Sequence, residues 1–178
     1  MQDQFQWVDT TGGPHVIAAV ESLAKWRGIE GWIDNGLEDP SDYARACRVR
    51  NWLGKVSSGT GCEAVVLSGD RGPVAWFPDP VGDAGVLVQW IGCDSEEAAF
   101  ALLRSWQATP AGERPYAEII EFDTGISGAM RLFDSTEVAG GSGATGLTIT
   151  LQPGRHKMLA VLVEAENCVA VLREIRRA

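Results

Sequence analysis

The chain has 178 residues and a formal net charge of −9, with 45% hydrophobic and 22% charged residues. This length is typical of one domain with a substantial core, and the composition excludes disordered, fibrous and coiled-coil proteins. The negative charge argues against nucleic acid or an anionic membrane as the partner and favours a basic one. No apolar run is long enough to cross a bilayer and no signal-peptide pattern opens the chain, so we expect a cytoplasmic protein.

Tryptophan and acidic residues are concentrated in the first part of the chain. All seven tryptophans precede residue 107, and residues 1–107 carry 15 acids against 8 bases. We therefore divide the chain into a Trp-rich acidic α+β segment, residues 1–107, and a β-rich segment, residues 108–178. A Thr-Pro-Ala-Gly linker at residues 109–112 separates them. We expect the two segments to pack together as one globular unit.

The first elements are short and are separated by breaker residues. Residues 5–8 and 16–20 predict two strands on either side of a Thr-Thr-Gly-Gly-Pro turn. Residues 21–26 predict a short helix that ends before a glycine. Residues 29–39 show no period, and we expect an exposed acidic loop there.

A second helix and a series of strands follow this loop. Asp39 and Pro40 predict the N-cap and first position of a helix that carries Tyr43, Ala46 and Cys47 on one face. Four β-rich runs then recur about every ten residues, which predicts an antiparallel meander. These runs are residues 52–56, 62–67, 73–77 and 86–91.

The clearest helix of the chain starts after residue 93. Asp94 predicts its N-cap, with Glu97 three residues later. Apolar residues then recur at i, i+3, i+4 and i+7, which predicts one stripe packed on a sheet. The stripe consists of Ala99, Leu102, Leu103 and Trp106.

The last third of the chain is dominated by predicted strands. Residues 117–122, 129–133 and 147–151 read as strands between glycine-rich turns. Residues 157–176 fit either a β-hairpin or one amphipathic helix, and their valine content and the preceding Pro-Gly turn favour the hairpin. Together these elements predict an α+β fold that is β-rich, with antiparallel sheet or sheets and two or three short helices packed on one side.

The cysteines show no metal-binding pattern. They are Cys47, Cys62, Cys93 and Cys168, and no two of them form a C-x-x-C pair. Without a zinc spacing, and in a reducing compartment, we expect four buried free thiols rather than disulfides.

The chain offers few candidates for catalysis or cofactor binding. His15 and His156 are the two histidines, and neither lies in a recognisable nucleophile motif. Residues 141–146 match G-x-G-x-x-G, but a predicted strand follows them where a dinucleotide site needs a helix, so we expect a loop. We therefore expect no catalytic, cofactor-binding or metal-binding residue. An enzyme built on His15 or His156 is kept as a third hypothesis.

The densest acidic patch surrounds one tryptophan that no periodic segment buries. We expect Trp32, Asp34, Glu38, Asp39 and Asp42 to contact a basic protein partner, and a solvated loop is the alternative interpretation. The other six indoles lie in predicted elements and are expected in the core. A carbohydrate- or small-molecule-binding β domain that uses exposed indoles is the second functional hypothesis.

Several segments resemble the immunity protein 21 family of bacterial polymorphic toxin systems. Residues 7–14 read WVDTTGGP, residues 21–28 read ESLAKWRG and residues 42–47 read DYARAC. The resemblance assigns a structural role to motif residues Trp7, Gly12, Gly13, Pro14, Tyr43 and Cys47. It implies a cytoplasmic protein that binds one cognate toxin domain and blocks it, with neither catalysis nor a cofactor. The charge favours a basic toxin such as a nuclease, although a peptidase or a deaminase fits the resemblance equally.

Overall fold

Two antiparallel sheets lie face to face in the computed structural model, which describes residues 6–30, 40–69, 72–80, 83–139 and 145–178. Sheet A contains, in spatial order, β1 (Trp7–Val8), β5 (Val74–Pro78), β6 (Gly85–Cys93), β11 (Cys168–Arg177), β10 (Arg155–Ala165) and β7 (Glu118–Asp123). Sheet B contains β3 (Leu53–Ser57), β4 (Glu63–Leu67), β2 (His15–Ala19), β8 (Ala129–Asp134) and β9 (Leu147–Thr150).

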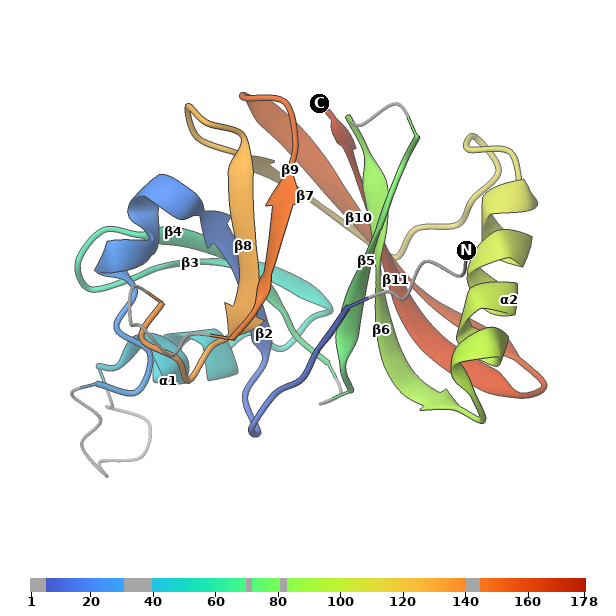
Figure 1. The fold of residues 1–178 in the computed structure, drawn as a ribbon, viewed down its shortest axis with the longest axis horizontal. Helices are drawn as coiled ribbons and strands as arrows, with labels where there is room; N and C mark the ends of the chain where they lie inside the picture. The colour runs from blue at the N-terminus through green and yellow to red at the C-terminus, as the bar shows by residue number, and fades with distance from the viewer. Residues whose placement is uncertain (1–5, 31–39, 70–71, 81–82, 140–144) are drawn as a thin grey trace.

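Each sheet carries its helices on one side, the side that faces away from the other sheet. Helix α2 (Glu96–Ala108) covers sheet A, while the 3₁₀ helix η1 (Val20–Lys25) and helix α1 (Asp42–Cys47) lie against sheet B. Figure 1 shows α2 and α1 at opposite ends of the molecule, with the two sheets between them. The prediction of a β-rich α+β fold with short helices is confirmed.

Alternation along the strands builds three apolar layers, because successive side chains of a strand point to opposite faces. In β10, Met158 and Ala160 point into the core between the sheets, whereas Val161 and Val163 point toward α2. Ile17 of sheet B enters the same central core. A third layer lies between sheet B and its helices.

The predicted helices exist, but their caps differ from the prediction. Helix α2 buries the predicted stripe, yet its N-cap is Ser95, whose side chain accepts a hydrogen bond from Ala98 N at 3.2 Å. Helix α1 is capped by Ser41, which accepts from Ala44 N at 3.1 Å. The caps assigned to Asp94 and Asp39 are therefore wrong, because in each case a serine closer to the first turn reaches the free backbone N–H.

The predicted meander is instead two separate hairpins. Strands β3 and β4 pair in sheet B, whereas β5 and β6 pair in sheet A. The chain passes between the sheets near Gly72, where a Cβ atom would lie 1.3 Å from the Trp90 carbonyl oxygen. Regular turn spacing predicts hairpins, but it does not show whether consecutive hairpins belong to one sheet or to two. Strands with both faces buried occur in a single meander and in a pair of packed sheets alike.

The C-terminal hairpin is confirmed. Strands β10 and β11 pair from His156 opposite Arg177 to Ala165 opposite Cys168. This hairpin lies beside β6, and β8 lies beside β2, so residues 108–178 contribute strands to both sheets.

The expectation of four free thiols is wrong for one pair. Cys93 of β6 lies directly opposite Cys168 of β11, with their Cα atoms 3.9 Å apart, and the two form a disulfide. They lie 75 residues apart in sequence, so their proximity follows only from the pairing of β6 with β11. Cys47 and Cys62 are free; Cys62 is buried as expected, whereas Cys47 is exposed.

Candidate functional site

Of the predicted partner-contact residues, only Asp42 lies in the described part of the chain. Trp32, Asp34, Glu38 and Asp39 fall outside the described residues. Their contact with a partner therefore stays a prediction.

The carboxylate of Asp42 joins three segments inside the protein. It is 3% exposed, and its Oδ2 accepts a hydrogen bond from Arg27 N at 2.9 Å. Its Oδ1 accepts from Gly59 N at 3.1 Å and forms a salt bridge with Arg45 Nη1 at 2.8 Å. Since these groups occupy both oxygens, we treat Asp42 as structural and do not include it in a contact surface.

Residues from the family motifs meet at one cavity of about 380 Å³ between the 10–14 turn and α1. Gly13 packs so tightly there that a Cβ atom would lie 2.5 Å from Ser135 Oγ and 2.7 Å from Cε2 of Tyr43. The motif residues that line the cavity are Gly12, Gly13, Pro14, Tyr43 and Cys47. Trp7 lies elsewhere: its Nε1 donates to Glu96 Oε1 at 2.7 Å and thus ties β1 to α2.

Asp134, the last residue of β8, binds the 10–14 turn through hydrogen bonds. Its Oδ2 accepts hydrogen bonds from Thr11 N at 2.6 Å and Thr11 Oγ1 at 2.8 Å, and its Oδ1 accepts from Thr136 N at 2.9 Å. Burial by itself raises the pKa of Asp134, but these hydrogen bonds outweigh burial and leave the pKa below its ordinary value. The carboxylate therefore stays ionised and holds the turn.

Both histidines are fully buried. His15 Nε2 lies 2.9 Å from Val8 O, and His156 Nδ1 lies 3.2 Å from Gly154 O. Burial lowers the pKa of His15, although the hydrogen bond to Val8 and the charge of Asp134 partly offset it. An imidazole in the closed interior does not reach a substrate, so the burial of both rings gives no support to a histidine-dependent active site.

A buried guanidinium links the two sheets. Arg173 of β11 is fully buried, and its Nη2 donates to Ser68 O at 2.6 Å and to Trp52 O at 3.2 Å. Glu118 accepts from Trp52 N at 3.0 Å and from Leu53 N at 2.9 Å. Burial lowers the pKa of Arg173, and the charge of Glu118 partly offsets this shift. These polar groups hold the start of β3 against sheet A.

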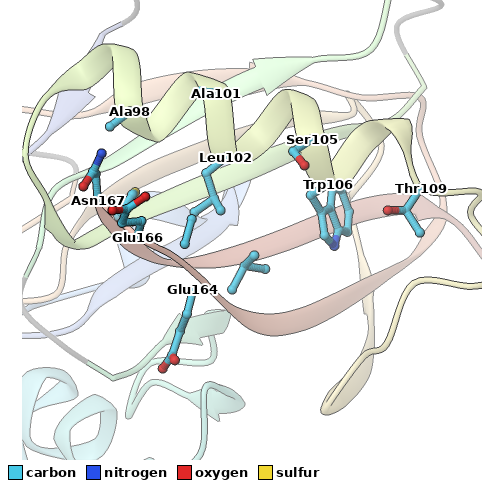
Figure 2. Close-up of a pocket in the computed structure, with 12 residues that line it drawn as sticks. Ala98, Ala101, Leu102, Ser105, Trp106, Thr109, Glu164, Glu166 and Asn167 are labelled. Atoms are coloured by element: carbon cyan, nitrogen blue, oxygen red, sulfur yellow. The ribbon is translucent and has the colours of Figure 1, made fainter.

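A second cavity, of about 450 Å³, lies between α2 and the tip of the β10–β11 hairpin. Figure 2 shows Leu102 and Trp106 pointing from α2 toward the hairpin, whereas Glu164 points away from the helix. We call this cavity the α2–β10 groove. Its lining residues on the helix and its C-cap are Ala98, Ala101, Leu102, Ser105, Trp106 and Thr109, and those on the hairpin are Val163, Glu164, Ala165, Glu166, Asn167 and Cys168.

Sequence reasoning missed the groove because it assigned α2 a single apolar stripe. Small residues at positions 98, 101, 105 and 109 form a second, shallower stripe at helical spacing, and this pattern is the signal that could have indicated an open face.

The described residues contain no group of three or more side chains that could hold a metal ion. No helix in this part of the chain is long and apolar enough to span a membrane. The strand β9 follows the glycine-rich residues 141–146, as predicted, so the helix that a dinucleotide site requires does not follow them.

Comparison with known proteins gives one match. The family model described as Immunity protein 21 matches residues 6–168 of this 178-residue chain. No curated protein and no solved structure matches the chain. The family match extends from β1 to the start of β11 and so covers strands of both sheets and the helices η1, α1 and α2 of the described residues. The chain therefore belongs to the immunity protein 21 family.

Proposed function

We propose that this protein binds one cognate bacterial toxin domain in the cytoplasm and neutralises it as a stoichiometric inhibitor, without catalysis. The family match over residues 6–168 is the observation that carries the proposal. The net charge of −9 supports a basic toxin, because opposite charges accelerate encounter and disfavour wrong partners.

The packing of the molecule supports inhibition by binding. Two sheets share one core, and buried polar groups such as Asp42 and Asp134 tie loops to this scaffold. A rigid surface loses little conformational entropy when it binds, which favours a tight complex. The burial of both histidines gives no support to catalysis by a histidine acid or base.

The second hypothesis, a small-molecule- or carbohydrate-binding β domain, needs exposed indole rings on which a ligand can stack. Among the six tryptophans in the described residues, Trp26 and Trp106 are buried and the other four are half-buried. Trp7 and Trp90 pack edge to face with their ring centres 5.6 Å apart. These six rings thus serve internal packing, and we favour the toxin-binding proposal.

The proposal is tested with the toxin domain encoded next to the gene. Bacteria that express this toxin alone should stop growing, and co-expression of the immunity protein should restore growth. The two chains should also co-purify in a 1:1 ratio, whereas an unrelated toxin serves as the specificity control. If the protein neither protects against any neighbouring toxin nor forms a complex with one, the proposal is refuted.

A further inference from the structure

Strand β10 is longer than the strand that covers its outer edge. Strand β7 pairs with β10 only from Arg155 to Ala160, although β10 extends to Ala165. In the part of the chain that the structure describes, no strand pairs with residues 161–165 on that side. The last five residues of β10 thus form a free sheet edge.

The register shows which main-chain groups face this edge. Even-numbered residues of β10 direct their N–H and C=O groups toward β7, as in the hydrogen bonds from Thr124 N to Gly154 O (3.0 Å) and from Ala117 N to Ala160 O (2.9 Å). The groups of Leu162 and Glu164 continue this row beyond the end of β7. Free edges of this kind readily accept another strand.

The α2–β10 groove lies directly above the free edge. Val163 points toward α2 and contributes to the floor of the groove with Leu102 and Trp106. Side chains on the opposite face are exposed: Leu162 is 38% exposed, and Glu164 points away from α2. A strand added at this edge would therefore place alternate side chains in the apolar groove and beside Glu164.

The charged side chains around the free edge are mostly acidic and favour a basic strand as the binding partner. Glu164 and Glu166 lie at the hairpin tip, and Asp94, whose N–H donates to Asn167 O at 3.1 Å, brings a further acid next to it. Helix α2 contributes a single basic residue, Arg104. Acids therefore dominate this end of the molecule, and cross-strand pairs of opposite charge stabilise neighbouring strands.

We infer that an extended segment of the toxin adds to sheet A at residues 161–165 of β10, with apolar side chains in the α2–β10 groove and basic side chains opposite Glu164. This inference rests on the proposed function, since it names the surface that performs it. Recognition by strand addition draws affinity from main-chain hydrogen bonds and specificity from the alternate side chains. A second copy of this chain is a less suitable occupant, because it would bring Glu164 and Glu166 against like charges.

The main-chain part of the inference is tested by Leu162→Pro, with Leu162→Thr as the matched control. Proline removes the N–H that faces the free edge, while the hydrogen bonds between β10 and β11 use the odd-numbered residues. Threonine removes the same apolar side chain but keeps the N–H. In titration calorimetry with a catalytically inactive form of the neighbouring toxin domain, we expect Leu162→Pro to weaken binding at least tenfold and Leu162→Thr to weaken it less than threefold.

The charge part is tested by Glu164→Lys, with Glu63→Lys as the control. Glu63 is exposed on β4 of sheet B, so both variants change the net charge equally. We expect a loss of at least tenfold for Glu164→Lys and less than threefold for Glu63→Lys. Thermal unfolding of every variant verifies the fold, and if Leu162→Pro proves unstable the charge pair decides.

The outcomes separate this inference from the proposed function. Wild-type affinity in both Leu162→Pro and Glu164→Lys would overturn the inference while the immunity function stands. Failure of the unmodified protein to bind the toxin would overturn the function, and with it the inference. A dimer of the free protein that Leu162→Pro abolishes, measured by light scattering, would assign the edge to a second copy instead.

Discussion

Replacing Asp134 with alanine should destabilise the protein strongly, because this side chain anchors the family-motif turn. The carboxylate is 2% exposed and accepts the hydrogen bonds described above from Thr11 and Thr136. A hydrogen bond to a charged group contributes about 1.5–3 kcal/mol. Since bonds to one carboxylate are not additive, we expect a total loss of about 3–5 kcal/mol.

The free energy of unfolding is measured by urea denaturation at pH 7. Asp9→Ala is the matched control, because Asp9 precedes the same turn and is exposed, so its removal should cost no more than about 0.5 kcal/mol. The hydrogen bonds lower the pKa of Asp134 in the folded state. Its stabilisation is therefore complete above about pH 4 and is lost as the pH falls further. Equal losses in the two variants, or a loss that does not shrink toward pH 3, would refute this role.

Three further predictions concern packing, titration and the disulfide. Gly13→Ala should lower the free energy of unfolding by about 1–3 kcal/mol, because the added methyl group overpacks the 10–14 turn. The control Gly92→Ala, whose Cβ atom would meet nothing within 4 Å, should be neutral in the same urea assay. Equal effects of the two substitutions would contradict the tight packing of the turn. Burial lowers the pKa of His15, so the unfolded chain takes up a proton below about pH 6.5 while the folded state resists it. Stability should therefore fall as the pH drops from 7.5 to 5.5, and His15→Gln should flatten this fall; an unchanged slope would exclude His15 as its cause. A thiol assay on the unfolded, unreduced protein should count two thiols, and four after reduction of Cys93–Cys168; four from the start would contradict the disulfide.

Local patterns predicted most elements of this fold. The strand over residues 129–133 and the helix stripe ending at Trp106 were placed correctly because apolar periodicity and turn residues act over a few positions. The assignment of strands to two sheets was not predicted. It depends on contacts between distant segments, such as β6 with β11, which no local pattern encodes.

The site was less accessible to sequence reasoning than the fold. Asp42 belongs to an acidic run, but its carboxylate faces inward because Arg27 N and Gly59 N supply donors from other segments. The free edge of β10 arises from a difference in length between β10 and β7. Such a mismatch becomes visible only when the register of the two strands is known.

The central claim is that this protein neutralises a toxin by binding it. A titration of the purified neighbouring toxin with increasing amounts of the protein tests this claim most directly. We predict that toxin activity falls linearly and reaches zero at a molar ratio of one, since a stoichiometric inhibitor is consumed by its target. Full toxin activity at a molar excess would contradict binding, and complete loss of activity at a small fraction of one equivalent would contradict inhibition without catalysis.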